Sequence, residues 1–245
     1  MSKPRRLLIS ALLAAVSFAT CLLVLVSPAP AADKGGPAIS SNIFADAPVG
    51  KINWSGIYIG LHGGYGVADG ALSFGPATID GLAASGAVGG IHAGADVQIH
   101  GSMLVLGLRG DYTWSHEEFS ISAPGGAFKA SLHDGWGADA RVGLALGTAL
   151  PYLFVGYTQE HTAASLTGGP AISAPDLRGW RVGGGVEFRI PKMTTETFNT
   201  TLAAEYKHTD FSEVTLGGPG GPKLNVTDDV FMTRLNFRFG ESYSK

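Results

Sequence analysis

The chain has 245 residues, of which 45% are hydrophobic and 15% are charged, and 36 of them are glycine. Glycine weakens helix interiors, so this composition disfavours a helical domain and favours strands and loops. The formal net charge of -3 provides no basic excess to neutralise nucleic-acid phosphates, and we therefore expect no nucleic-acid partner.

The first segment is typical of a secretory signal peptide. A positively charged start precedes an apolar run over residues 7–26, and small residues at 29–32 suit signal cleavage. We assign residues 1–32 to a signal peptide that is cleaved near Ala31 or Ala32. The alternative is an uncleaved helix that anchors the chain in a membrane.

The single cysteine, Cys21, lies inside the apolar run, so we expect neither a disulfide nor a thiolate metal site in the mature chain. The alternative for Cys21 is lipidation. Residues 33–52 contain Gly, Pro and Ser without a sustained period and are predicted to form a flexible lead-in. The folded domain is predicted to span residues 53–240, followed by a short tail at 241–245.

Apolar residues recur at every second position through much of this domain. This is the periodicity of a β-strand, because neighbouring side chains of a strand point to opposite faces. Eight segments show the alternation: residues 54–65, 90–99, 103–114, 136–146, 151–159, 180–190, 200–209 and 230–239.

In these segments, large apolar side chains occupy one face, and glycine and charged side chains occupy the other. The charges are of both signs, and we expect them to pair with one another. The charged residues on the glycine-bearing face are Asp96, Arg109, Asp111, Asp139, Arg141, Arg181, Glu187, Arg189, Glu205, Lys207, Arg234 and Arg238.

The connections between the segments alternate in length. Short turns on one side of a sheet and long loops on the other are typical of outer-membrane barrels, whose turns are periplasmic and whose loops are extracellular. Residues 100–102 and 147–150 form tight connections, and residues 191–199 form one of moderate length. The long connections, rich in Gly, Pro, Ser and Thr, are residues 67–83, 115–131, 160–178 and 210–229.

Together these patterns predict an all-β fold, a closed antiparallel eight-stranded transmembrane up-and-down β-barrel. Hydrocarbon offers no hydrogen-bond partners, so strands cross it as a closed sheet with the apolar face toward lipid and the polar face in the lumen. The alternative is a soluble sandwich or ligand-binding barrel with the two faces reversed. Aromatic residues near strand ends favour the membrane fold, because they suit the interfaces: Trp54, Tyr65, Trp114, Trp136, Trp180 and Phe239.

Three blocks of the sequence resemble a known family, the small porin-like outer-membrane β-barrels related to opacity-type and outer-membrane immunogenic surface proteins of Gram-negative bacteria. They are WSGIYIG at 54–60, LGLRGDYTWS at 106–115 and GWRVGGGVEF at 179–188. The resemblance implies an outer-membrane location, insertion by the barrel-assembly machinery, and a role in envelope integrity or surface contact. The family commonly ends on an aromatic residue, whereas residues 240–245 follow Phe239 here.

The twelve lumen charges support two hypotheses. The first is a structural plug, because the interior of an eight-stranded barrel is just filled by side chains, and the second is a narrow path for small solutes. Because exposed loops on a rigid barrel are where recognition residues usually lie, we expect any surface ligand to meet the long loops. The sequence leaves the oligomeric state open.

We expect no catalytic residue set, no cofactor and no metal. His62 and His92 project inward on neighbouring segments and are predicted to meet, but no third ligand accompanies them. The histidine and acidic residues at 116–118 and 133–134 are interpreted as solvated charges. A membrane lipid hydrolase is the enzymatic alternative, although Ser, His and acidic residues form no recognisable local signature.

Overall fold

The structure, a computed structural model, describes residues 51–123, 126–166, 171–172, 176–216, 220–241 and 243–244. The predicted signal peptide and most of the predicted lead-in lie outside these residues. Among the described residues, no helix is long and apolar enough to cross a bilayer. Eight long strands dominate: β2 (Gly56–Phe74), β3 (Ala77–Gln98), β4 (Leu104–Ala123), β5 (Gly126–Leu144), β6 (Ala149–Leu166), β8 (Leu177–Thr194), β9 (Phe198–Phe211) and β11 (Lys223–Phe239).

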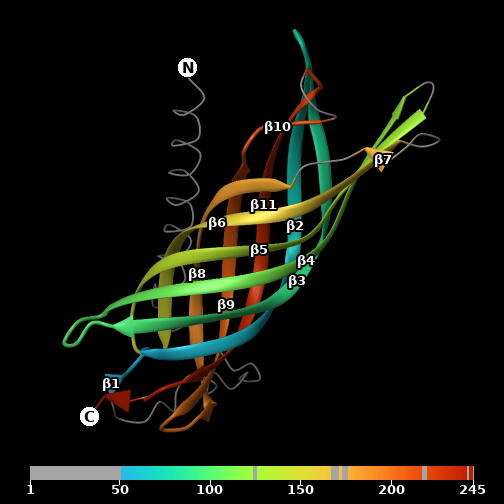
Figure 1. The fold of residues 1–245 in the computed structure, drawn as a ribbon. Helices are drawn as coiled ribbons and strands as arrows, with labels where there is room; N and C mark the ends of the chain where they lie inside the picture. Colours follow the sequence, from blue (N-terminus) through green and yellow to red (C-terminus); the bar gives the residue numbers. More distant parts are fainter. Residues whose placement is uncertain are drawn as a thin grey trace, which may run out of the picture. The chain divides into compact units, whose positions relative to one another are not determined.

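The eight long strands form a closed antiparallel barrel (Figure 1). Each long strand pairs with the long strand that follows it in the chain, and β11 pairs with both β9 and β2, which closes the ring. Every long strand therefore has a hydrogen-bonded neighbour on both sides, as a sheet in hydrocarbon requires. The predicted eight-stranded closed barrel is confirmed.

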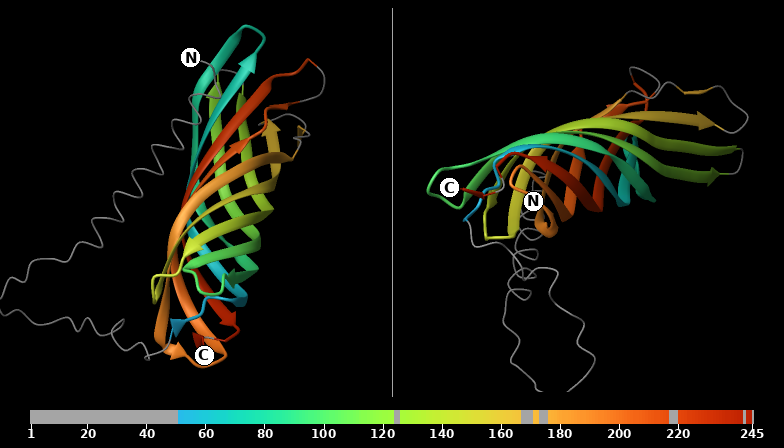
Figure 2. Two further views of the ribbon diagram at one scale, coloured as in Figure 1. Left: turned by 90° about the vertical axis from the view of Figure 1, so that its left-hand side faces the viewer. Right: turned by 90° about the horizontal axis from the view of Figure 1, so that it is seen from below.

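The connections alternate between short turns and long hairpins. Gly101 and Gly147 adopt positive φ angles of 72° and 63° in two of the short turns, a conformation that glycine reaches without strain. Figure 2 shows the long hairpins, among them β2–β3 and β4–β5, projecting together from the opposite end. We call the two ends of the barrel the short-turn end and the hairpin end.

The prediction of long loops was wrong in one respect. Most of residues 67–83 and 115–131 continue the strands as paired ladders, with register shifts at Gly70/Ala71 and at Trp114/Glu117, and β2 and β3 stay paired as far as Phe74 and Ala77. The alternation of the membrane segments carries on into these residues, and antiparallel pairing across a tight turn satisfies their backbone groups better than an open loop does. The hairpins are thus extensions of the barrel wall.

Two short strands lie at the predicted ends of the domain. The last two residues of the predicted lead-in form β1 (Lys51–Ile52), which pairs with β12 (Tyr243–Ser244) in the predicted tail. The remaining short strands, β7 (Ala171–Ile172) and β10 (Val214–Thr215), extend β6 and β11 at their hairpin ends.

The two faces of the barrel wall differ sharply in chemistry. Large apolar side chains cover the outside, where Ile57 is 64% exposed and Leu108 is 68% exposed. Polar and ionised side chains fill the inside and are almost entirely removed from solvent. A soluble barrel would reverse this arrangement, so the distribution of side chains favours a barrel whose outer wall faces hydrocarbon.

Candidate functional site

The candidate site is the polar interior of the barrel. All twelve charged residues that the alternation assigned to the lumen are buried there, none more than 8% exposed. They come from β3, β4, β5, β8, β9 and β11, and each points inward because it shares strand parity with the inward glycines. Ten of the twelve belong to one of two groups, and within each group the ion pairs are linked to one another.

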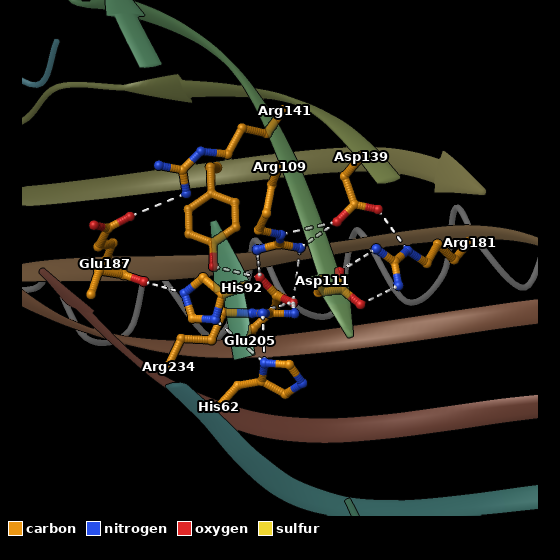
Figure 3. Close-up of polar contacts among 12 residues, drawn as sticks. His62, His92, Arg109, Asp111, Asp139, Arg141, Arg181, Glu187, Glu205 and Arg234 are labelled. Carbon is orange, nitrogen blue, oxygen red and sulfur yellow. Dashed lines mark hydrogen bonds and ion pairs between the residues drawn. The ribbon is translucent and has the colours of Figure 1, made fainter. Parts of the chain in front are cut away.

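The first group, the central cluster, contains Arg109, Arg181 and Arg234 with Asp111, Asp139 and Glu205. Glu205 is its hub. Its carboxylate accepts hydrogen bonds from Arg109 at 2.7 Å, Arg234 at 3.0 Å and the Tyr152 hydroxyl at 2.6 Å (Figure 3). The remaining contacts link Arg109 to Asp139, Arg181 to Asp139, and Arg181 to Asp111.

The second group, the short-turn cluster, contains Arg141 and Arg238 with Asp96 and Glu187. Arg141 donates to both carboxylates, and Arg238 donates to Glu187 at 3.0 Å and to Asp96 at 2.6 Å. The two clusters together hold five arginines and five carboxylates, so their formal charges cancel. Buried charges are tolerated when they are paired and hydrogen-bonded in this way.

Glycines in the wall make room for these pairs. Gly156 is the register partner of both Asp139 on β5 and Arg181 on β8, which bond to each other across it. Gly107 stands in the same way between Asp96 on β3 and Arg141 on β5. A side chain at either glycine would occupy the space through which its two neighbours meet.

We expect Gly156→Ala to lower the free energy of unfolding by about 1–3 kcal/mol, the usual cost of overpacking a filled interior. The added Cβ would overlap the Asp139 carboxylate and the backbone oxygen of Ala138. Gly110→Ala on the outer wall is the matched control, because its Cβ would meet nothing nearer than the Gly137 oxygen at 3.8 Å. Urea unfolding of the refolded barrel measures both, and equal losses would contradict this role for Gly156.

His62 and His92 meet in the lumen as predicted, with their Nδ1 atoms 3.3 Å apart. His92 Nε2 lies 2.6 Å from the Asn236 side-chain oxygen, and His62 Nε2 lies 3.0 Å from the Thr113 hydroxyl. The two rings lie beside the central cluster (Figure 3). Among the described residues, no group of three or more His, Cys, Asp or Glu side chains is placed to hold a metal ion.

Trp54 is not the interfacial aromatic that the sequence predicted. It is 0% exposed and closes the short-turn end of the lumen from within, packed with Val105 and Leu150. Its indole Nε1 donates to the Gly147 oxygen at 3.2 Å, and the guanidinium carbons of Arg189 and Arg238 lie 5.0 and 5.4 Å from its ring. The chain enters the barrel at this point, so the first residues of the domain turn under the lumen and act as a stopper.

The other predicted interfacial aromatics lie on the outer wall. Their exposed fractions range from 43% for Phe239 to 66% for Trp180. In the strand ladders, Trp114, Trp136, Trp180 and Tyr65 lie toward the hairpins and Phe239 lies toward the short turns. Four of the five aromatic side chains thus lie on the hairpin side of the outer wall, and one lies on the short-turn side.

The sequence missed the polar layer near the hairpins. Asp228 is buried, and its Oδ2 atom lies 3.8 Å from Lys207 Nζ. Glu160 interacts electrostatically with both residues. Both acids fell within residues that were predicted as loops. Continuing the inward parity of Arg234 back along β11 to position 228 would have found Asp228.

Apolar side chains seal the lumen beyond this layer. Ala68, Ala84, Leu177, Phe211 and Val226 pack together inside the wall at the hairpin end. From the short-turn end to the hairpin end, the lumen therefore contains the Trp54 stopper, then the ion pairs, and then this apolar seal. Within the two clusters, the arginines and carboxylates are engaged with one another.

Comparisons with known proteins agree with this architecture. Residues 18–239 match the family model described as outer membrane protein beta-barrel domain. The 31 kDa outer-membrane immunogenic protein of Brucella melitensis is 28% identical over 223 residues, which cover 80% of this chain and 86% of that protein. The protein of the same name from Brucella suis gives the same values.

Two solved structures also show similarity. OprG from Pseudomonas aeruginosa has a TM-score of 0.47 at 14% identity, covering 78% of this chain and 99% of that chain. Neisserial surface protein A has a TM-score of 0.40 at 18% identity, covering 73% of this chain and 97% of that chain.

Proposed function

Since the chain belongs to the outer membrane protein β-barrel family, we propose that it is a closed structural barrel that supports the envelope and makes surface contacts through its long hairpins. The observation that carries the proposal is the filled lumen. Five arginines and five carboxylates pair across it between a tryptophan stopper and an apolar seal. A barrel so filled favours a mechanical and recognition role over transport or catalysis.

The hairpins are the proposed contact surface, and we place them outside the cell. The strands continue well beyond the aromatic residues that border the apolar band, so the hairpins stand clear of the bilayer on a rigid base. Exposed segments on a rigid scaffold are the usual sites of recognition. The short-turn end, with both ends of the described chain, would then face the periplasm.

Labelling of intact cells tests this orientation. An epitope inserted between Gly75 and Pro76, at the tip of the β2–β3 hairpin, is expected to bind antibody on whole cells. The matched insertion after Gly101, in a short turn, is expected to bind antibody only after the outer membrane is opened. Labelling of the Gly101 insertion alone on intact cells would reverse the assigned orientation.

Shortening the β2–β3 hairpin tests the surface role. Removal of residues 73–78 and closure of Leu72 to Ile79 through Asn-Gly keeps their register, because these two residues are already paired, and Asn-Gly suits a two-residue turn. We expect attachment of cells to their surface ligand to fall toward the level of a strain that lacks the protein, with heat-modifiable gel mobility unchanged. Deletion of residues 162–176 tests the β6–β8 hairpin in the same way. Full attachment by both variants would contradict the proposed role in surface contact.

Sensitivity to detergent and to large antibiotics measures the contribution to envelope integrity. A strain that lacks the protein is expected to be more sensitive than the parent, and the hairpin-shortened variant is expected to restore resistance. This comparison separates envelope integrity from surface contact, because we expect only the barrel to be needed for integrity.

Lipid analysis tests the hydrolase alternative. A barrel without lipid hydrolase activity is expected to leave the lipid species unchanged when it is expressed, and altered lipid species would favour the hydrolase.

A further inference from the structure

A continuous series of hydrogen bonds crosses the lumen between the two ion-pair clusters. Its centre is the histidine pair, with the two Nδ1 atoms 3.3 Å apart (Figure 3). At its ends, the Thr113 hydroxyl lies 3.5 Å from the Asp111 carboxylate, and the Thr201 hydroxyl donates to Glu187 at 2.5 Å. The members of this series, which we call the histidine relay, are in order Thr113, His62, His92, Asn236, Thr201 and Glu187.

Asn236 fixes the position of the hydrogen on His92. The Asn236 Nδ2 donates to the Thr201 hydroxyl at 3.0 Å, and the Asn236 Oδ1 lies 2.6 Å from His92 Nε2. An amide oxygen only accepts hydrogen bonds, so His92 Nε2 is the donor in this contact. The Nδ1 of a neutral His92 is then a bare acceptor.

The hydrogen of His62 follows from that of His92. If Arg234 Nη1, which lies 3.4 Å from His62 Nδ1, were the donor to this atom, two bare nitrogen lone pairs would face each other at 3.3 Å. With its hydrogen on Nδ1, His62 instead donates to His92, and its Nε2 accepts from the Thr113 hydroxyl at 3.0 Å. Every bond of the relay then has the same direction, and both rings are neutral.

Glycines on the neighbouring strand make room for the two rings. Gly60 on β2 is the register partner of His92, and Gly90 on β3 is the register partner of His62. A Cβ on either glycine would lie 2.6 Å from the Nε2 atom of the ring opposite it. Both rings therefore lie over bare backbone, where they can approach each other, and both are buried.

The charges around the pair disfavour an added proton. The titratable and charged groups that face the rings come from β2, β4, β9 and β11, and they are Tyr58, Arg109, Asp111, Glu205 and Arg234. Both carboxylates of this set are already paired with arginine. Because Arg234 Nη1 lies 3.4 Å from His62 Nδ1, a proton added to His62 would create a second buried cation beside the guanidinium.

We propose that the hydrogen bond between His62 and His92 is an acid-sensitive latch between the two ion-pair clusters. The latch is closed while both rings are neutral, because His62 Nδ1 then donates to His92 Nδ1 and the relay is unbroken. A proton that His92 takes up from solvent goes to its Nδ1, the one nitrogen of that ring without a hydrogen, and the bond to His62 is lost. Release of this proton at neutral pH closes the latch again. The latch belongs to the barrel interior and is independent of the proposed surface role.

Acid is expected to weaken the barrel through this pair. The ordinary pKa of histidine is about 6.5, so the unfolded chain takes up a proton on each ring as the pH falls below that value. The closed latch holds both rings neutral, and the unfolded chain therefore binds more protons than the barrel. The stabilisation is complete above about pH 6.5 and is lost as the pH falls. Its full slope is about a tenfold change in the unfolding equilibrium constant per pH unit for each ring, or about a hundredfold for the pair.

Urea unfolding of the complete barrel in micelles at several pH values tests the latch. Below about pH 6.5, the wild type is expected to lose up to about a hundredfold more in its folding equilibrium constant per pH unit than the double variant His62→Gln with His92→Gln. The difference between these two proteins cancels the other titrating groups, which both share. His100→Gln, in a short turn where the ring is exposed, is the matched control and is expected to follow the wild type. Equal pH dependence in the wild type and the double variant would overturn the latch.

Nitrogen NMR of the wild-type barrel with isotope-labelled histidine observes the latch without any substitution. At neutral pH, the hydrogens are expected on His62 Nδ1 and His92 Nε2, with a scalar coupling between the two Nδ1 nuclei across their hydrogen bond. The coupling is expected to disappear when acid protonates His92 and to return at neutral pH. A hydrogen on His62 Nε2 at neutral pH, or the lack of a coupling between the rings, would overturn the proposal even if the double variant fails to fold.

Discussion

Glu205→Gln is expected to lower the free energy of unfolding of the barrel by about 3–5 kcal/mol, the usual cost of removing one partner from a buried ion pair. Glu205 accepts hydrogen bonds from Arg109, Arg234 and Tyr152, and its side chain is fully buried. Asp139 still compensates Arg109 in the variant, whereas Arg234 loses its carboxylate. Urea unfolding in micelles, followed by gel mobility, measures the loss.

Two further variants show whether the cost of Glu205→Gln comes from its buried ion pairs. Glu213→Gln removes the partner of Lys223 in an exposed pair, and its expected cost is at most about 1 kcal/mol. The double variant Glu205→Leu with Arg234→Leu is expected to regain part of the stability, because it removes both charges of the pair. A loss for Glu205→Gln no larger than that for Glu213→Gln would contradict the role of the central cluster.

Trp54→Ala is expected to cost about 3–5 kcal/mol, the range for truncation of a large aromatic side chain in a packed interior. The substitution empties the stopper between Val105 and Leu150 and removes the ring that Arg189 and Arg238 face. Trp180→Ala on the outer wall is the control and is expected to cost less. A larger loss for Trp180→Ala would restore Trp54 to the interfacial role that the sequence predicted.

Strand parity explains why so much of the barrel was predictable. Once one charged residue such as Arg109 is assigned to the lumen, every second residue of its strand is assigned there too. Lumen-facing glycines on neighbouring strands then mark where long side chains need space. Strand parity could not place Trp54, because this residue precedes β2 and alternation applies only within a strand. The chain turns back under the lumen at this point. Its partners are 93 residues away at Gly147 and 184 residues away at Arg238.

The pairing pattern of the lumen also lay beyond the sequence. Alternation places Asp139 and Arg181 inside but does not say that they meet, because they stand two strands apart and bond across Gly156. Shear between strands decides such partners, and shear is a property of the closed ring.

The central claim is that the lumen is closed, and planar-bilayer recording of the refolded wild-type barrel tests it most directly. We expect a membrane with inserted protein to show no stable unitary conductance, and we expect Arg109→Ala and Asp111→Ala to lower stability more than they change permeability. The ion-pair clusters, the Trp54 stopper and the apolar seal each contribute to this closure. A reproducible unitary conductance in the wild-type protein would contradict the account and establish a narrow pore.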